Sequence, residues 1–198
     1  MRLVVGLGNP GLRYARNRHN VGFMAIEAIA RRHGIAGFRS RFKGELAEGS
    51  ISGERRLLLK PQTFMNDSGE SVAEAARFFK ILPSEIVVLH DEIDLRPGKL
   101  RVKCGGGTAG HKGLRSIDAL LGPDFWRVRI GVGHPGVKEL VLPYVLQNFP
   151  SEEVSLWVAP LLDAVAETIG LLLAGTPEAF MSEVARRFAP PELEEASA

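Results

Sequence analysis

The chain has a single cysteine among its 198 residues, which excludes an internal disulfide framework and a zinc site built from several cysteines. Its first residues run directly into an apolar strand pattern, without the layout of a secretory signal peptide. No stretch reaches the ~18 uninterrupted apolar residues of a membrane span. The longest candidate, residues 156–175, is interrupted by Pro160, Asp163 and Glu167. These absences predict a soluble protein in a reducing, cytoplasmic setting.

The chain also lacks a G-x-S-x-G nucleophile elbow and an H-E-x-x-H zinc pair. Cys104, seven residues before His111, is a candidate nucleophile. A lone cysteine at a strand end is more often a small packed residue, however. Activation of water by a histidine is the simpler chemistry for this sequence.

The composition is that of an ordinary globular domain, with 45% hydrophobic and 24% charged residues. The formal net charge of +2 is unevenly distributed. Residues 190–198 hold three glutamates and no base, so we expect one domain over residues 1–189 and a disordered acidic tail. Residues 96–115, in contrast, hold six bases and no acid in a glycine-rich setting. Such a run is either a solvated face or a phosphate-binding surface.

Apolar runs of strand length alternate with segments of helical periodicity along the chain. The predicted strands cover residues 2–7, 42–51, 55–60, 85–90, 99–103 and 126–132, and the predicted helices cover 21–32, 70–80, 110–121, 151–174 and 177–188. Asn20 precedes the first helix as a candidate N-cap. The strand runs are largely apolar on both faces. We therefore predict a single α/β domain with a mixed, mostly parallel central sheet flanked by helices on both faces.

The segment Gly6-Leu7-Gly8-Asn9-Pro10-Gly11 matches the G-x-G-x-x-G pattern of dinucleotide-binding folds. In those folds the glycines open a helix whose first amides hold the pyrophosphate. Here Pro10 removes one amide, and the helix is expected to begin about nine residues after Gly11. The acid expected on a second strand is Glu27, which lies inside a helix. The context disfavours a nucleotide-cofactor enzyme.

His19 and Asp91 are the residues placed best for chemistry. His19 ends a polar loop just before a helix N-terminus, which disfavours the imidazolium and keeps the ring available as a base. Asp91 follows an apolar strand at its carboxyl end, where open α/β sheets place their sites. The carboxylates of residues 91–94 either bind a magnesium ion, or one of them orients a histidine, or they form a polar turn. Asn9 and Asn66 lie in loops, where an amide can hold a peptide or simply make a turn.

Several separated motifs resemble those of bacterial peptidyl-tRNA hydrolases, in the family's order and spacing. They are Gly6–Gly11, Tyr14, Arg18-His19-Asn20-Val21-Gly22, Lys60-Pro61-Gln62-Thr63-Phe64-Met65-Asn66 with Ser68-Gly69, His90-Asp91-Glu92-Ile93-Asp94-Leu95, Gly105-Gly106-Gly107, Gly110-His111 and Arg129-Ile130-Gly131-Val132-Gly133-His134-Pro135. The resemblance runs from residue 3 to about residue 150. Several motifs in register are far more specific than any one of them.

The resemblance implies a monomeric, cytosolic enzyme that needs no metal and no cofactor. Such an enzyme hydrolyses the ester of peptidyl-tRNAs released early from ribosomes, returns the tRNA and spares free aminoacyl-tRNA. By position, His19 is its general base and Asp91 is the partner of that base. The residues implied to hold or line the substrate are Asn9, Tyr14, Met65 and Asn66, and those implied to bind the tRNA phosphate are Lys103 and Arg129.

Lys112 departs from the family pattern, because the family commonly has an asparagine there that is credited with a substrate contact. Lysine donates hydrogen bonds but cannot accept them. We therefore expect Lys112 either to alter that contact or to replace it with a phosphate interaction.

The basic residues Lys99, Arg101 and Lys103 alternate along one predicted strand and share a face, as do Arg127 and Arg129 on another. That face suits a phosphate backbone, although Arg101 and Arg127 taken singly also fit solubilising charges. A non-catalytic RNA-binding relative of the same fold is the alternative function. The pairing of a base with a carboxylate favours the enzyme, since a binding protein needs neither.

Overall fold

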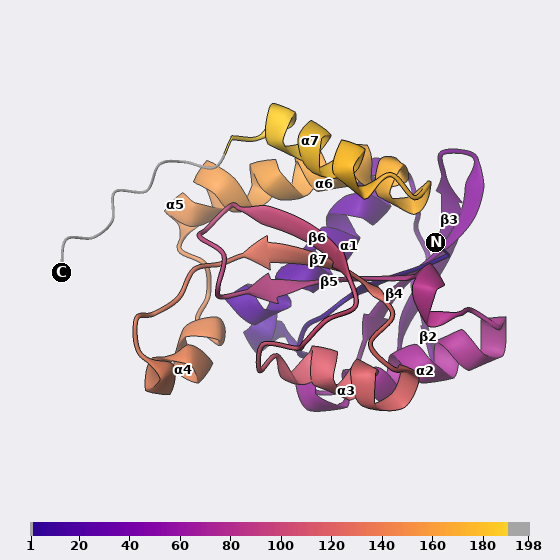
Figure 1. The fold of residues 1–198 in the computed structure, drawn as a ribbon, viewed down its shortest axis with the longest axis horizontal. Coiled ribbons are helices and arrows are strands. Elements are labelled where there is room, and N and C mark those ends of the chain that lie inside the picture. Colours follow the sequence, from indigo (N-terminus) through magenta and orange to yellow (C-terminus); the bar gives the residue numbers. More distant parts are fainter. Residues whose placement is uncertain (1, 190–198) are drawn as a thin grey trace.

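The computed structural model describes residues 2–189. Seven strands form one sheet in the order β2-β3-β4-β1-β5-β7-β6, and helices cover both of its faces (Figure 1). The predicted α/β architecture is confirmed. The acidic tail predicted for residues 190–198 lies outside the described residues, so the domain boundary and the disorder of the tail stay predictions.

The strands are β1 (Leu3–Gly6), β2 (Arg39–Arg41), β3 (Gly44–Ile51), β4 (Glu54–Pro61), β5 (Ile86–Glu92), β6 (Leu100–Cys104) and β7 (Trp126–Gly131). The helices are α1 (Val21–Arg32), α2 (Ser68–Phe79), α3 (Lys112–Leu121), α4 (Val141–Val145), α5 (Ser151–Glu153), α6 (Ala159–Leu173) and α7 (Pro177–Arg187). Short turns include η1 (Leu12–Tyr14), η2 (Arg18–Asn20), η3 (Met65–Asp67), η4 (Pro83–Glu85) and η5 (Lys138–Leu140), and η6 (Val154–Val158) is π-helical. Every predicted strand and helix is present, whereas β2 and α4 were not predicted.

The centre of the sheet is parallel, and both of its edges are antiparallel. β1 pairs in parallel with β4 and β5, and β5 pairs in parallel with β7. β2, β3 and β4 pair antiparallel at one edge, as do β6 and β7 at the other. The carboxyl ends of the parallel strands therefore lie along one edge of the sheet, where sites form in folds of this kind.

Two apolar cores lie on opposite faces of the sheet. Val4 packs with residues of α1, α6 and α7 in one core. Leu3 and Val5 pack with residues of α2 and α3 in the other. This alternation follows from the two-residue period of a strand. It also explains why β1 and β5 are continuous apolar runs, since both of their faces are covered.

The continuous helical segment Ser151–Leu173 is long and apolar enough to cross a membrane by composition, with a mean hydropathy of 1.7. Within the fold, however, 61% of its apolar window is buried. Trp157, Val165 and Ile169 belong to the core that α1 and the sheet share with it. The segment is therefore a core helix in the layer that covers one face of the sheet.

Two glycines bring the first turn of α1 directly against the sheet. A Cβ added at Gly6 would lie 2.1 Å from the Gly22 carbonyl oxygen, and one added at Gly22 would lie 2.4 Å from the Leu89 carbonyl oxygen. Gly8 has a similar role, since a Cβ there would lie 2.8 Å from the Phe23 ring. The glycine pattern therefore serves close packing of helix on strand. That packing carries η2, which precedes α1, to the carboxyl end of β5.

Candidate active site

His19 and Asp91 meet at the carboxyl edge of the sheet. His19 lies in η2 and Asp91 near the end of β5, and His19 Nδ1 lies 2.9 Å from both carboxylate oxygens. Both residues are buried, with exposures of 9% and 4%. A carboxylate can only accept, so the Nδ1 atom carries the proton and Nε2 is left with a free lone pair. Of the interpretations open for the carboxylates, the geometry favours the one in which Asp91 orients a histidine.

A second histidine, His111, shares the same carboxylate. Its Nε2 atom lies 3.0 Å from Asp91 Oδ1, and its Nδ1 accepts hydrogen bonds from the Gly113 and Leu114 amides at 3.2 and 3.3 Å. Since Nδ1 accepts, the proton is on Nε2, which donates to Asp91. His111 thus caps α3 and fixes Asp91 at once.

In the sequence, His111 stood out only beside Cys104 and in the Gly110-His111 motif, and its contact with Asp91 was not predicted. Cys104 is exposed at the end of β6, and no hydrogen bond joins it to His111 in the described part of the chain. A histidine at the start of a predicted helix, after a glycine-rich loop, was the available signal. The sequence did not show that His111 caps α3, or that it contacts Asp91.

The electrostatic setting keeps Asp91 ionised and His90 neutral. Burial acts to raise the pKa of Asp91, but His19 and His111 outweigh it and hold that pKa well below the usual value. Burial lowers the pKa of His90 to about 3, and the neighbouring His111 adds to this effect. The His90 and His111 rings are 5.0 Å apart, and His90 Nδ1 donates to the Asp91 carbonyl oxygen at 2.7 Å.

His19, Asp91 and His111 each offer a metal-ligating atom, and these atoms lie within 4.8 Å of one another. A neutral histidine that binds a metal through Nε2 carries its proton on Nδ1 and donates it to an acceptor. At His111 that proton would face two amide donors instead. The donor set therefore fits a hydrogen-bonded network better than a metal centre. Metal-free action remains a prediction.

Asn9, Asn20 and Met65 are tied together beside these residues. Asn9 Oδ1 accepts from the Met65 amide at 2.8 Å. Asn20 Oδ1 accepts from the Asn9 amide, and Asn20 Nδ2 donates to the Asn9 carbonyl oxygen, both at 2.9 Å. Asn20 thus occupies the predicted N-cap position of α1, but its side chain makes no capping bond. Among the described residues no partner is recorded for Asn9 Nδ2, which leaves it as a donor.

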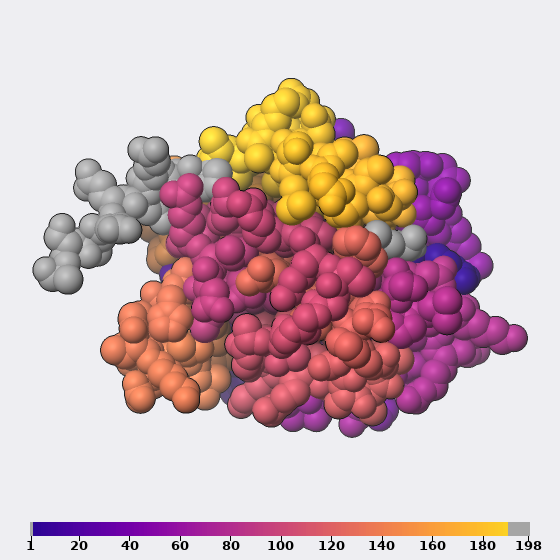
Figure 2. Space-filling view, in the orientation of Figure 1, coloured from indigo at the N-terminus to yellow at the C-terminus, as the bar shows by residue number. Residues whose placement is uncertain are grey.

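A cavity of about 390 Å³ opens beside the catalytic candidates. It is bounded by the ends of η2 and β5, the start of α3, and α4. Its lining residues are His19, Asp91, Glu92, Ile93, Ala109, Gly110, His111, Lys112, His134, Lys138, Val141, Leu142 and Val145. In Figure 2 the segment around α4 forms a lobe at the lower left of the molecule.

The structure brings some of the predicted substrate residues together and leaves others apart. His19, Asp91 and Lys112 line the cavity. Met65 lies against the start of α3, because a Cβ at Gly113 would be 2.6 Å from its sulfur. Asn66 is exposed, and Tyr14 is half-buried with its ring under the Arg13 guanidinium. Neither of these two lines the cavity.

The predicted basic face is present on β6 and β7. Arg101 lies opposite Arg129, and Lys103 lies opposite Arg127, so all four side chains leave the same face of the sheet. Arg129 Nε donates to Glu92 Oε2 at 2.9 Å, which leaves its two Nη groups for other acceptors. A Cβ at Gly106 would lie 2.8 Å from Lys103 Nζ, so the glycine loop covers this ammonium closely.

The solubilising interpretation of Arg127 is wrong. Its side chain is completely buried, stacks on the Phe125 ring at 4.6 Å and donates to the Gly107 carbonyl oxygen. The alternating pattern predicted the face that Arg127 occupies. It could not show that the glycine loop lies over that face. Arg101, in contrast, is exposed.

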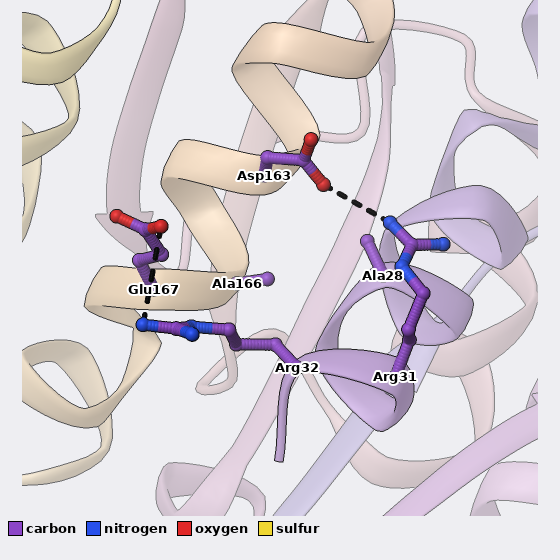
Figure 3. Close-up of a pocket in the computed structure, with 6 residues that line it drawn as sticks. All are labelled: Ala28, Arg31, Arg32, Asp163, Ala166 and Glu167. Carbon is purple, nitrogen blue, oxygen red and sulfur yellow. Dashed lines mark hydrogen bonds and ion pairs between the residues drawn. The ribbon is translucent and has the colours of Figure 1, made fainter. Parts of the chain in front are cut away.

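Another hollow, of about 340 Å³, lies between α1 and α6 (Figure 3). Arg31 pairs with Asp163 at 3.0 Å, and Arg32 with Glu167 at 3.9 Å. These are exposed, mutually compensated pairs. Surface pairs of this kind contribute little, so the hollow is a weaker candidate than the cavity beside His19.

The fold and the site together define a class of α/β enzymes in which a histidine–carboxylate pair at the carboxyl edge of the sheet can activate water. Known proteins identify the family within that class. The model of the peptidyl-tRNA hydrolase family matches residues 3–192. The chain belongs to this family.

Relatives from several bacteria agree over nearly the whole chain. Peptidyl-tRNA hydrolase of Rhodospirillum rubrum is 62% identical over 192 residues, covering 97% of this chain and 79% of that protein. The enzyme of Bradyrhizobium diazoefficiens is 60% identical over 184 residues, covering 93% and 91%. The crystal structure of peptidyl-tRNA hydrolase from Acinetobacter baumannii superposes with a TM-score of 0.88 at 44% identity, covering 93% of this chain and 94% of that one.

Proposed function

We propose that this protein hydrolyses the ester bond of peptidyl-tRNA, releasing the peptide and free tRNA, with His19 as the general base. The observation that carries the proposal is the buried His19–Asp91 pair at the edge of a cavity, in a chain of this family. We also propose that the enzyme acts as a cytoplasmic monomer and needs no metal or cofactor.

In this mechanism His19 Nε2 takes a proton from a water molecule as the water attacks the ester carbonyl. Asp91 holds the ring through Nδ1–H and stabilises the imidazolium that forms. The protonated His19 then gives its proton to the departing ribose oxygen. A base of this kind contributes on the order of 10²–10⁴ in rate, which goes far toward hydrolysis of an activated ester.

His111 acts in this scheme as a positioning residue. The α3 amides hold its proton on Nε2, so its bond to Asp91 Oδ1 is permanent. The Asp91 side chain is thereby held in one rotamer. The two histidines on one carboxylate thus have different roles. His19 moves protons, and His111 holds the Asp91 carboxylate that accepts hydrogen bonds from both rings.

Asn9 supplies the donor for the oxygen that becomes negative in the transition state. Its Oδ1 is committed to the Met65 amide, which leaves Nδ2 as the donor for the substrate. Preorganised donors at such a position contribute about 10²–10³. Asn66 and Tyr14, by their place in the family motifs, contact the peptide part of the substrate, and Met65 provides an apolar wall.

Basic side chains of the protein bind the tRNA part of the substrate. Lys103 and Arg129 bind a phosphate near the acceptor end. The Arg129 guanidinium is oriented by Glu92 so that its Nη groups remain available. Lys112 lines the cavity itself, where its ammonium donates to a phosphate or ribose oxygen of the 3′ end. It replaces the contact of the family's usual asparagine.

The test is hydrolysis of an N-acetylaminoacyl-tRNA, compared with the same tRNA carrying the free amino acid, in the presence of EDTA. The proposal predicts cleavage of the blocked substrate and sparing of the free one, with EDTA harmless. If the blocked substrate binds and is not cleaved, the protein is the non-catalytic RNA-binding relative instead. Loss of cleavage in EDTA alone would overturn metal-free action.

A further inference from the structure

Arg18, the residue before His19, has a buried guanidinium enclosed by one segment of the chain. Arg18 is 6% exposed. Its Nη2 donates to Glu153 Oε1 at 2.7 Å, and its Nη1 donates to the Asn148 carbonyl oxygen at 3.1 Å. The guanidinium carbon lies 4.5 Å from the centre of the Tyr144 ring and 5.3 Å from that of Phe149.

All four partners of the Arg18 side chain belong to residues 144–153. This segment begins in α4, whose residues Val141, Leu142 and Val145 line the cavity beside His19. The Tyr144 hydroxyl in turn donates to the Val132 carbonyl oxygen beyond β7. Through its contacts with residues 144–153, the guanidinium therefore holds α4, which forms one wall of the cavity.

The backbone of the same turn is attached separately. The Arg18 amide donates to the Gln147 carbonyl oxygen at 3.0 Å, and the Phe149 amide donates to that of Arg16 at 2.9 Å. Asn17 and Asn148 form an isolated bridge between these bonds. His19 has its own bonds to Asp91. Removal of the Arg18 side chain would leave these backbone bonds and the His19 contact in place.

A purely stabilising role does not account for the choice of arginine. A buried ion pair costs desolvation, and well-packed apolar residues of similar volume stabilise a fold as well or better. The cost is visible here, because Arg18 Nε is buried without a partner. What a guanidinium supplies is a flat fork that stacks between two rings while it donates in two directions. Lysine cannot do this.

We infer that Arg18 is a positioning residue for substrate binding: its guanidinium fixes α4 as the wall of the cavity, in register with His19 on the same turn. This inference rests on the proposed function, since the cavity is taken to receive the substrate. It assigns two tasks to adjacent residues. His19 acts on the ester, and Arg18 sets the wall against which the substrate lies.

The experiment compares Arg18→Gln, Arg18→Lys and Glu153→Gln with the unaltered protein, using the N-acetylaminoacyl-tRNA substrate. Because the wall contacts the substrate alike before and during reaction, we expect KM to rise about tenfold and kcat to stay within about twofold. Arg18→Lys is expected not to rescue KM. Glu153→Gln keeps the Arg18 guanidinium and weakens its ion pair with residue 153. This variant tests the inference if the Arg18 variants do not fold.

Trp157 gives a readout that activity does not. Its Nε1 donates to Glu153 Oε2 at 3.2 Å, and its ring packs on Phe149 at 5.4 Å. Trp126 is the only other tryptophan, so a Trp126→Phe background isolates the signal. We expect the Trp157 emission of Arg18→Gln to shift, and the shift to be absent in the matched control Arg31→Gln, whose exposed pair with Asp163 joins α1 to α6.

A fall in kcat with unchanged KM, a Lys variant with the parent KM, or an equal KM rise in Arg31→Gln would each overturn the inference. If the unaltered protein failed to cleave the substrate, the proposed function would fail by itself. The inference is then judged by affinity for the uncleaved substrate. Weaker binding by Arg18→Gln but not by Arg31→Gln supports it, and equal binding by all variants overturns it.

Discussion

Asp91 accepts hydrogen bonds from two histidines whose second ring nitrogens face different surroundings. At His111 that nitrogen is occupied by two backbone amides, which fixes the tautomer. At His19 it is free to take a proton. The difference lies in the α3 amides and not in the histidines themselves. In the proposed mechanism His19 is therefore the histidine that moves protons.

Substitution of His111 separates its two roles. His111→Asn keeps a good N-cap for α3, but its shorter side chain places no donor within reach of Asp91, so we expect its melting temperature to fall less than that of His111→Ala. We expect kcat to fall roughly 10- to 150-fold, because a hydrogen bond to a charged group is worth about 1.5–3 kcal/mol and about 1.4 kcal/mol is a factor of ten. His111→Ala should lose about 1 kcal/mol of stability as well. Equal kcat in His111→Asn and the parent protein would contradict the positioning role.

His90 makes the fold sensitive to acid. Its pKa is lowered from 6.5 to about 3 in the folded protein, so between these values the unfolded chain binds a proton that the folded chain does not. Stability therefore falls as the pH drops from 6.5 toward 3. His90→Gln keeps a side-chain N–H and cannot titrate. We expect urea midpoints of this variant to depend less on pH across that window.

The half-buried His33, which bonds the Ala166 carbonyl oxygen, provides the control for His90. His33→Gln, measured in the same way, checks that the change in His90→Gln comes from the buried His90 ring and not from the loss of any histidine. The same dependence in His90→Gln as in the parent protein would show that another group is responsible.

At this scale the sequence predicted His19 and Asp91 because strand ends and helix starts are visible in the apolar pattern. It could not predict that His111 reaches Asp91, or that Asn20 bonds Asn9 instead of capping α1. Both contacts depend on how α3 and α1 are placed over the sheet. Residue types allow such bonds, and only tertiary structure selects among them.

The packing of α1 on β1 and β5 is the element-level feature that positions the site. Gly22 meets the backbone of Leu89 in β5 and of Leu7 directly after β1, and backbone cannot give way like a flexible side chain. We expect Gly22→Ala to cost about 1–3 kcal/mol through overpacking and to lower kcat by displacing η2. Thermal melts and steady-state kinetics measure the two effects.

Gly107 provides the matched control, because a Cβ there meets nothing within 4 Å. Gly107→Ala should leave the melting temperature unchanged. A Gly22→Ala protein as stable and active as the parent would show that α1 is free to adjust.

The elements missed from the sequence lack the patterns on which prediction depends. β2 is three exposed residues, Arg-Ser-Arg, with no apolar alternation. α4 is five residues with a proline in the middle, too short for helical periodicity to emerge. The order of the strands was also out of reach, since β1 lies between β4 and β5, which follow it in the chain.

At the scale of the whole molecule, Arg101, Lys103 and Arg129 project from one face of β6 and β7, next to the buried Arg127. Electrostatic binding of a phosphate weakens with salt in proportion to the number of contacts. We expect Lys103→Ala to raise KM and to reduce the slope of log(kcat/KM) against log salt by roughly 0.7–0.9. Lys43, in the turn between β2 and β3 at the other edge of the sheet, is the matched control. An equal change of slope in Lys43→Ala would show that the effect comes from the net charge of the protein and not from a phosphate contact of Lys103.

Net charge alone would have hidden this side of the molecule, since the formal total is only +2. The run of bases between residues 96 and 115 indicated it correctly. The sequence could not show that Arg127 is buried beneath the glycine loop, because a charged residue on an alternating strand is ordinarily exposed. Burial of that charge became visible only when the loop was placed over the strand.

The central claim, that His19 is the base, is tested most directly by single-turnover hydrolysis of an N-acetylaminoacyl-tRNA by His19→Ala, with tRNA affinity measured in parallel. Because a general base contributes about 10²–10⁴ in rate, we predict a loss of that size with unchanged affinity. A His19→Ala variant that binds the N-acetylaminoacyl-tRNA and hydrolyses its ester at close to the parent rate would contradict the account.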